Sequence, residues 1–263
     1  MSTTSFVIAG SEATGGAGLQ ADLKTFEKLG VYGVGTITCI VSFDPKSGWG
    51  HRFAPIDGSV IADQIEAATA AHDLDVVKIG MLGTPGTVAT VANSLKKQPW
   101  RHVVVDPVLI CKGQEPGMAL DTDNALRTEI LPLATVVTPN LFEAATLAGM
   151  DALETIDDLA EAARRIADLG PRYVAVKGGV GLPGDDAIDV VFDGQDVTVL
   201  RAPKIGDERV SGAGCIFAAA ITAELAKGAE VLDAVATAKK FAHAGIVGRI
   251  TTNAPFTAVG WQA

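Results

Sequence analysis

The chain has 263 residues, a formal net charge of −10, and 48% hydrophobic and 20% charged residues, which is typical of a globular protein with a large core. The negative charge argues against nucleic acid or an anionic membrane as a partner. The start MSTTSF lacks a signal-peptide pattern and no segment is apolar enough to span a membrane, so we expect a cytoplasmic protein. Three cysteines without CxxC spacing argue against disulfides and structural zinc.

Apolar, β-branched stretches alternate with helical patterns along the chain. A short strand is predicted at 5–10, and the helix that follows within 15–30 carries its apolar residues on one face. The further strands of this kind are predicted at 34–43, 75–82, 102–110, 134–140 and 173–179, each preceded by a helical pattern. The repeat predicts an α/β fold, with a mostly parallel sheet covered by helices on both faces.

The last third of the chain departs from this repeat. Residues 187–203 predict two strands that meet at an Asp-Gly dipeptide (193–194), which is typical of a hairpin. Two helices follow, at about 213–227 and 231–249. Because no linker, low-complexity tract or internal repeat breaks the pattern, we expect one domain over residues 1–263.

Residues 44–56 (DPKSGWGHRFAPI) interrupt the alternation and surround Trp49, His51 and Phe53 with turn residues. The segment follows the end of a predicted strand, and parallel sheets bind their ligands at the carboxyl ends of their strands. It is either an exposed loop or small hairpin, or a lid over a ligand.

The stretch RVSGAGCIFAAA (209–220) places Cys215 in the first turn of a predicted helix. The glycines at 212 and 214 permit tight turns, and the helix start directs free N–H groups and a positive dipole toward one point. This pattern predicts an anion hole made of backbone, in which a cysteine is expected to have a lowered pKa. The alternative is a plain glycine turn followed by a small buried thiol.

Asn140 and Glu143 stand three residues apart in TPNLFEAATL, at the start of another predicted helix. This spacing favours a capping box, in which each side chain bonds the other residue's backbone amide. It also suits a Mg²⁺–phosphate site, because a carboxylate and an amide can hold metal-bound waters beside a nucleotide. The two interpretations are compatible, since a capped helix start can face phosphates.

Asp106 follows three valines at the end of a predicted buried strand. A carboxylate is costly in a core and reasonable in a ligand crevice, so we expect Asp106 at the crevice. Cys111 and Lys112 precede Gly113 in the next loop, which predicts a thiol over the same crevice edge. The alternative for Cys111 is a loop residue without a task.

Two other segments follow strand ends. In AGSEATGGAGLQAD (9–22), small residues flank Glu12 at a spacing that does not fit a dinucleotide fingerprint; the glycines suit close approach of a flat ligand to the backbone. In VKGG (176–179), Lys177 can neutralise phosphate or merely extend its ammonium to solvent.

Taken together, these segments resemble, in order and spacing, the hydroxymethylpyrimidine kinase group of the ribokinase superfamily. The segments are GGAGLQADLKTFEKLGVYG, VKIGMLGT, VVVDPVL, LPLATVVTPNLFEA, VKGG and SGAGC. The resemblance covers nearly the whole chain and implies a ribokinase-like three-layer αβα sandwich with a small lid at 44–56, ATP and Mg²⁺ as cofactors, and a homodimer. The group contains kinases of thiamine-pathway pyrimidines and pyridoxal kinases.

Three positions favour the pyridoxal kinases of this group. Pyrimidine kinases usually carry Gln-Asn where this chain has VSFDP, and Ala-Lys-Ser-Gly where it has Cys-Lys-Gly at 111–113; Trp49 to His51 resembles the pyridoxal kinase lid. With Cys111 and Cys215 the chain looks like the dual-cysteine type. A thiol adds reversibly to the aldehyde that pyridoxal carries beside its hydroxymethyl group, and a pyrimidine substrate offers no such carbonyl.

The resemblance implies a role for each candidate residue. Cys111 would form the hemithioacetal, Cys215 would deprotonate the 5′-hydroxyl, and the amides of Gly212, Ala213 and Gly214 would stabilise the transferring phosphoryl group. The residues implied to line the substrate pocket are Glu12, Ala17, His51, Met81 and Val108. Those implied for the nucleotide are Asn140, Lys177, Gly179, Ser211 and Lys240, and those implied for Mg²⁺ are Glu143 and Asp106.

Two positions depart from the family pattern. Ala213 stands where a threonine is usual, and Glu12 where an aspartate is usual; either could move the substrate preference. Two alternatives stay open: a hydroxymethylpyrimidine kinase of the same fold, and a vitamin- or nucleotide-binding regulator without turnover.

Overall fold

Nine strands form one continuous sheet in the computed structural model, which describes residues 3–109 and 116–261. Their order across the sheet is β3-β2-β1-β4-β5-β6-β7-β8-β9. The strands are β1 (Thr4–Glu12), β2 (Tyr32–Asp44), β3 (Gly50–Pro55), β4 (Val76–Ile79), β5 (His102–Val105), β6 (Val136–Val137), β7 (Tyr173–Lys177), β8 (Asp186–Phe192) and β9 (Val197–Pro203).

The strands from β2 to β7 in this order are all parallel to one another, which confirms the predicted mostly parallel sheet. Two hairpins extend it at its edges. Strand β3 folds back antiparallel on β2, so the segment 44–56 is a small hairpin. Strands β8 and β9 form the hairpin predicted at the Asp-Gly dipeptide.

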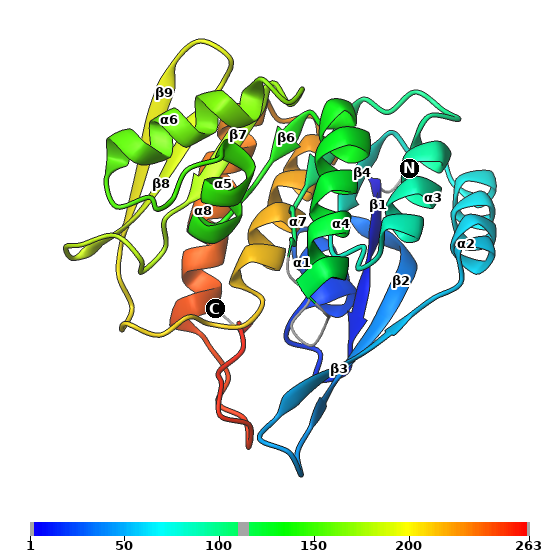
Figure 1. Cartoon of the computed structure of the whole chain (residues 1–263), viewed down its shortest axis with the longest axis horizontal. Coiled ribbons are helices and arrows are strands. Elements are labelled where there is room, and N and C mark those ends of the chain that lie inside the picture. The colour runs from blue at the N-terminus through cyan, green and yellow to red at the C-terminus, as the bar shows by residue number, and fades with distance from the viewer. Residues whose placement is uncertain (1–2, 110–115, 262–263) are drawn as a thin grey trace.

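Helices cover both faces of the sheet (Figure 1), as predicted. The helices are α1 (Gly18–Lys28), α2 (Gly58–Ala71), α3 (Pro85–Leu95), α4 (Pro116–Ala125), α5 (Leu141–Ala148), α6 (Ile156–Ala167), α7 (Ala213–Ala226) and α8 (Val231–Val247). Helices α1, α7 and α8 pack on one face, and the others on the opposite face. Among the described residues, no helix is both long and apolar enough to cross a membrane.

The strand sequences are apolar throughout because both faces of the sheet are buried. In β5, Val103 and Val105 point into the core beneath α2, α3 and α6, whereas Val104 points toward α7 and α8. Successive strand residues alternate between faces, so a strand between two helical layers needs an unbroken apolar run.

Several predicted strands are too long at their carboxyl ends. Regular pairing stops at Ile79, Val105 and Val137, before the residues predicted at the crevice. The cause in two cases is proline, because Pro107 and Pro139 have no N–H to donate to a neighbouring strand. The chain therefore leaves the sheet where Asp106 and Asn140 begin, and this places both residues at one rim.

Candidate active site

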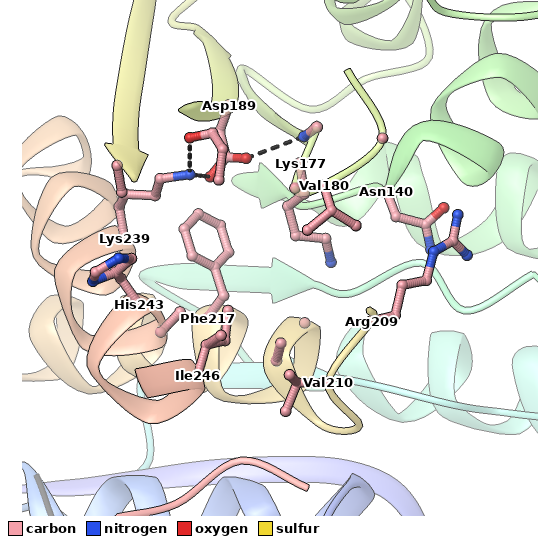
Figure 2. Close-up of a pocket in the computed structure, with 18 of the residues that line it drawn as sticks. Asn140, Lys177, Val180, Asp189, Arg209, Val210, Phe217, Lys239, His243 and Ile246 are labelled. Atoms are coloured by element: carbon pink, nitrogen blue, oxygen red, sulfur yellow. Dashed lines mark hydrogen bonds and ion pairs between the residues drawn. The ribbon is translucent and has the colours of Figure 1, made fainter. Parts of the chain in front are cut away.

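A cavity of about 360 Å³ opens at the carboxyl ends of β5, β6 and β7, where an open parallel sheet binds its ligands. Its lining comes from the loops after these strands, the β8–β9 hairpin, the first turn of α7 and one face of α8. Figure 2 shows charged side chains at opposite sides of this space, with Phe217 at its base and Ile246 beside it. The cavity thus combines an apolar interior with polar ends.

The glycine turn before α7 has the geometry expected of a backbone anion hole, and the name is kept for it below. Gly212 is the N-cap of α7 and has a φ of +81°. Because glycine has no side chain to cap the helix, the first amides of α7 keep their free N–H groups, and these residues line the cavity. A Cβ at position 212 would lie 1.9 Å from the carbonyl oxygen of Gly16. Only glycine fits there, for both conformation and space.

A C-terminal segment holds this turn in place. The amide of Ser211 donates to Thr257 O at 2.9 Å, and the amide of Val259 donates to Ser211 O at 3.0 Å. Ser211, predicted to bind the nucleotide, therefore uses its backbone to anchor the turn and is not among the residues that line the cavity. Phe256 of the same segment packs on Phe43, with ring centroids 5.0 Å apart, so the segment also reaches the β2–β3 hairpin (Figure 1).

Cys215 lies in the first turn of α7, half-buried, and lines the cavity. Burial raises the pKa of its thiol to about 11, and the Lys78 ammonium partly opposes this rise. The expectation of a lowered pKa is therefore wrong for the free protein, because desolvation of the thiolate outweighs the helix start. The thiol is mostly protonated at neutral pH.

An ion pair of Asp106 with Lys177 forms the next part of the site. Lys177 Nζ lies 2.8 Å from Asp106 Oδ1, and both side chains are largely buried. Burial alone would raise the pKa of Asp106, but the Lys177 and Lys78 charges hold it below its usual value. A Cβ added to Gly214 would lie 3.1 Å from Lys177 Nζ, so the Lys177 ammonium stands beside the anion hole.

Asn140 and Glu143 form the capping box at the start of α5. Asn140 Oδ1 accepts from the Glu143 amide at 3.0 Å, and Glu143 Oε2 accepts from the Asn140 amide at 2.8 Å. Both residues also line the cavity. Burial raises the pKa of Glu143 to about 7, although the nearby Lys177 lowers it. The capping interpretation is confirmed, and it leaves the carboxylate beside Lys177.

The donor set fits a Mg²⁺ ion that arrives with a nucleotide. Within the described ranges, no three His, Cys, Asp or Glu side chains converge as a ready-made metal site. Mg²⁺ needs no such cage, because it usually keeps several waters and is held by one or two carboxylates together with substrate phosphates. Asp106 and Glu143, on the rim of one cavity, can supply those carboxylates.

In the first loop, the Glu12 carboxylate binds groups of its own loop. The carboxylate of Glu12 accepts hydrogen bonds from the Thr14 hydroxyl at 2.7 Å, from the Thr14 amide, and from the Gly16 amide at 3.2 Å. It thus shapes the loop that supports Gly212, and its side chain is buried. Ala17 is half-buried at the N-cap of α1. Neither residue lines the described cavity.

The other residues predicted for the substrate lie at neighbouring strand ends. His51 is on β3, where its ring packs edge-on against Phe43 with centroids 4.6 Å apart. Met81 follows β4, and its sulfur lies 3.7 Å from the buried Cys39 sulfur. Val108 lines the cavity after β5. Cys111 falls outside the described residues.

At the far end of the cavity, Lys239 takes the place predicted for Lys240. Lys239 Nζ lies 2.8 Å from Asp189 Oδ2, and Asp189 Oδ1 accepts from the Gly178 amide at 3.1 Å (Figure 2). Lys240 is exposed and does not line the cavity. Successive side chains on a helix differ in direction by about 100°, so Lys239 faces the cavity and Lys240 faces away from it. Gly179 also lines the cavity.

We expect Lys239→Met to raise the KM for ATP on the order of tenfold, equivalent to about 1.4 kcal/mol. The variant leaves the buried Asp189 carboxylate without its cation, so the turn that Asp189 holds at Gly178 loosens at the cavity wall. Lys240→Met is the matched control and should keep the KM of the parent. Steady-state kinetics at varied ATP measure both, and equal effects of the two substitutions would contradict the assignment.

Sequence reasoning missed two sets of groups. Arg209 lines the cavity together with Asn140. Lys78 and Asp22 form a buried ion pair below the anion hole. The signal for the latter was a lone lysine within the apolar run DVVKIGML, because a charged residue in a buried strand requires a partner.

The sequence matches the family described as phosphomethylpyrimidine kinase over residues 12–259. A pyridoxine kinase of Bacillus subtilis is 47% identical over 239 residues, which cover 91% of this chain and 88% of that protein. The crystal structure of the ADP complex of Bacillus subtilis pyridoxal kinase superposes with a TM-score of 0.96 at 43% identity, covering 100% of this chain and 98% of that one.

Two further solved structures compare this chain with a pyridoxal kinase and with a pyrimidine kinase of the same family. Staphylococcus aureus pyridoxal kinase in complex with AMP-PCP and pyridoxal gives a TM-score of 0.92 at 38% identity, covering 99% of this chain and 93% of that one. A phosphomethylpyrimidine kinase from Clostridium difficile gives 0.77 at 33% identity, covering 91% and 97%. The similarity is greater to the two pyridoxal kinases than to this pyrimidine kinase. The chain belongs to the phosphomethylpyrimidine kinase family.

Proposed function

We propose that this chain is an ATP-dependent pyridoxal kinase, which transfers the γ-phosphoryl group of ATP to the 5′-hydroxymethyl group of pyridoxal and also accepts pyridoxine and pyridoxamine. The observation that carries the proposal is the glycine turn at Gly212, whose amides face a cavity beside the Lys177 ammonium and the Cys215 thiol. Phosphoryl transfer depends mainly on positioning and on stabilising charge, which these groups supply. The greater similarity to pyridoxal kinases supports the choice of substrate.

The residues of the chain divide the work of the transfer. The substrate hydroxyl oxygen bonds to the γ-phosphorus while the bond from that phosphorus to the bridging oxygen of ADP breaks. The amides of Ala213, Gly214 and Cys215 stabilise the charge on the phosphoryl oxygens, and Lys177 neutralises part of it. The hydroxyl proton passes to the thiolate form of Cys215, which regenerates the thiol.

A divalent cation has a defined place in this scheme. Glu143 and Asp106 would hold Mg²⁺ through their carboxylates, with Asn140 beside them. When bound, Mg²⁺ neutralises phosphate charge and orients the phosphates of ATP. The ion pair of Asp106 with Lys177 keeps this carboxylate ionised and therefore ready for a cation.

Cys111 is proposed to hold pyridoxal by its aldehyde. In the adduct, a bond forms between the sulfur and the aldehyde carbon, and the thiol proton moves to the carbonyl oxygen, giving a hemithioacetal. Pyridoxine carries an alcohol in place of the aldehyde and cannot form this bond. The thiol should therefore matter for one substrate only.

Cys111→Ala is expected to lower kcat/KM for pyridoxal on the order of tenfold or more, which corresponds to about 1.4 kcal/mol of lost binding. The kcat/KM for pyridoxine should stay within about twofold. Parallel steady-state assays of both substrates check this, with pyridoxine as the internal control for folding. Equal losses on the two substrates would remove the hemithioacetal role.

A coupled assay for ADP release tests the function itself, with pyridoxal or hydroxymethylpyrimidine as the acceptor at equal concentrations of Mg-ATP. A kcat/KM for pyridoxal at least about 10²-fold higher supports the proposal. The reverse preference would assign the chain to the pyrimidine kinases of the family. Tight binding of pyridoxal without phosphate transfer would instead indicate a regulator.

A further inference from the structure

Lys78 and Asp22 form an ion pair beneath the anion hole that takes no direct part in the proposed transfer. Lys78 Nζ lies 2.7 Å from Asp22 Oδ2, and the two side chains are 1% and 0% exposed. Neither residue lines the cavity. Lys78 belongs to the central strand β4 and Asp22 to helix α1, so the pair joins the sheet to a helix.

Stability gives a weak reason for such a pair. Moving two charges out of water costs several kcal/mol per ion, and mutual attraction offsets this only when the remaining polar atoms are also satisfied. Oδ1 of Asp22 is buried and accepts no hydrogen bond within the described part of the chain. Apolar side chains of similar volume could fill this space without that cost, so the charges themselves need an explanation.

The geometry directs the pair toward Cys215. Cys215 lies in the first turn of α7, and the Gly18 amide at the start of α1 lowers the pKa of the Cys215 thiol. Asp22 lies four residues further along α1, on the same face of that helix. The Lys78 ammonium reaches toward the carboxyl end of β4, where a Cβ added to Gly80 would lie 3.0 Å from Nζ. Helix α7, which carries Cys215, packs against both α1 and β4.

We propose that Asp22 and Lys78 are a positioning pair for the transfer site. Asp22 fixes the Lys78 ammonium on the inner side of Cys215, and this cation favours the thiolate that accepts the proton of the substrate hydroxyl. Neither side chain touches the substrate. The inference rests on the proposed function only in making Cys215 the base.

Four charged groups from four elements act on the Cys215 thiol: Lys78 on β4, Asp22 on α1, Asp106 after β5 and Lys177 on β7. Burial has the largest effect on the Cys215 pKa and raises it; Lys78 is the strongest of the charges and lowers it, while Asp22 and Asp106 raise it. Burial also lowers the pKa of Lys78, but the negative charges around it outweigh burial and keep it raised. The ammonium therefore persists at neutral pH.

The two members of the pair should consequently have opposite effects on the thiol. Lys78→Met removes the favourable cation, so Cys215 should be harder to ionise. Asp22→Asn removes an unfavourable anion and leaves the cation, so Cys215 should be easier to ionise. If the pair had only a structural role, both substitutions would destabilise the fold and neither would shift the pKa of the Cys215 thiol.

The test is the rate at which iodoacetamide alkylates Cys215 in the full-length protein without substrate, followed by mass spectrometry of the Cys215 peptide. Below its pKa, a thiol reacts in proportion to its thiolate fraction, about tenfold for each unit of pKa. At one fixed pH, Lys78→Met should react on the order of tenfold more slowly than the parent, and Asp22→Asn several-fold faster. The pH profile of kcat should move in the same directions.

Two further variants keep the test interpretable. Arg101→Met breaks an ion pair with Asp75 whose residues do not line the cavity, and should leave the alkylation rate of Cys215 unchanged. The double variant Asp22→Asn/Lys78→Met carries no unpaired buried charge, so it should fold even if a single variant does not, and it should react more slowly than the parent. Rates equal to that of the parent in the folded pair variants would overturn the inference.

The outcomes also separate this inference from the proposed base. Alkylation without substrate reports only the electrostatics of the pair, whereas turnover of Cys215→Ala reports whether the thiol is needed. If the pair variants change the alkylation rate but Cys215→Ala turns over normally, Cys215 is not the base and the pair does not assist catalysis. If the alkylation rates are unchanged but Cys215→Ala loses most of its turnover, only the positioning role of the pair is refuted.

Discussion

Cys215→Ala is expected to lower kcat for pyridoxal phosphorylation by about 10²- to 10⁴-fold, the usual contribution of a positioned acid or base. The amides of Gly212 to Cys215 are backbone groups and stay in place, so the variant should bind ATP with nearly the affinity of the parent. Stopped assays give kcat, and calorimetry with ATP gives the affinity. Near-normal turnover would remove Cys215 as the base.

The pH dependence of turnover gives a second measurement on the same residue. Because burial raises the pKa of Cys215 to about 11, the thiolate fraction of the free protein grows with pH across the neutral range. The parent kcat should therefore rise with pH wherever proton transfer limits the rate, and the rise should disappear in Cys215→Ala. If kcat still rises with pH in Cys215→Ala, another group is responsible for the titration.

The fold followed from the sequence because its signals are local. Apolar runs such as the valines before Asp106 predict buried strands, and the Asp-Gly dipeptide predicts the β8–β9 hairpin that the structure contains. The carboxyl ends of those strands then meet at one edge by geometry alone, which brings Asp106, Asn140 and Lys177 together. Their convergence needed no knowledge of side-chain packing.

The errors at the site come from contacts between distant residues. The sequence shows that Cys215 begins a helix, but not how deeply neighbouring elements bury it, and burial reversed the expected direction of its pKa shift. Nor does the sequence show that the Glu12 carboxylate accepts hydrogen bonds from the Thr14 and Gly16 amides of its own loop. The partner of Lys78 lies 56 positions away on another element, where no local pattern can identify it.

A common layout connects these observations. Two ion pairs lie on either side of the glycine turn: Lys177 with Asp106 on the cavity side, and Lys78 with Asp22 on the inner side. Each of these two ammonium groups is paired with one carboxylate, which keeps the ammonium from moving into the anion site when no phosphate is bound. Charges held in place before the reaction need little rearrangement as negative charge develops, which is the main advantage of a protein site over water.

Gly212→Ala is expected to lower kcat/KM by at least about 10²-fold, the cost of losing an oxyanion donor. The new Cβ would lie 1.9 Å from Gly16 O and 3.1 Å from Val259 Cγ2, and the first of these is backbone that cannot rotate away. The start of α7 must therefore shift, which displaces its amides from the cavity. The left-handed φ of +81° adds roughly 1–2 kcal/mol of strain for alanine.

Gly228→Ala is the matched control at the other end of α7. Gly228 also has a positive φ, +92°, but a Cβ there would meet nothing within 4 Å. This variant should show the conformational strain alone, a drop in Tm of roughly 2–4 °C per kcal/mol, with kcat/KM unchanged. Thermal unfolding and steady-state kinetics on both variants separate strain from displacement of the anion hole. If both glycine variants lose activity equally, the collision with Gly16 has no special role and the turn acts only through the stability of α7.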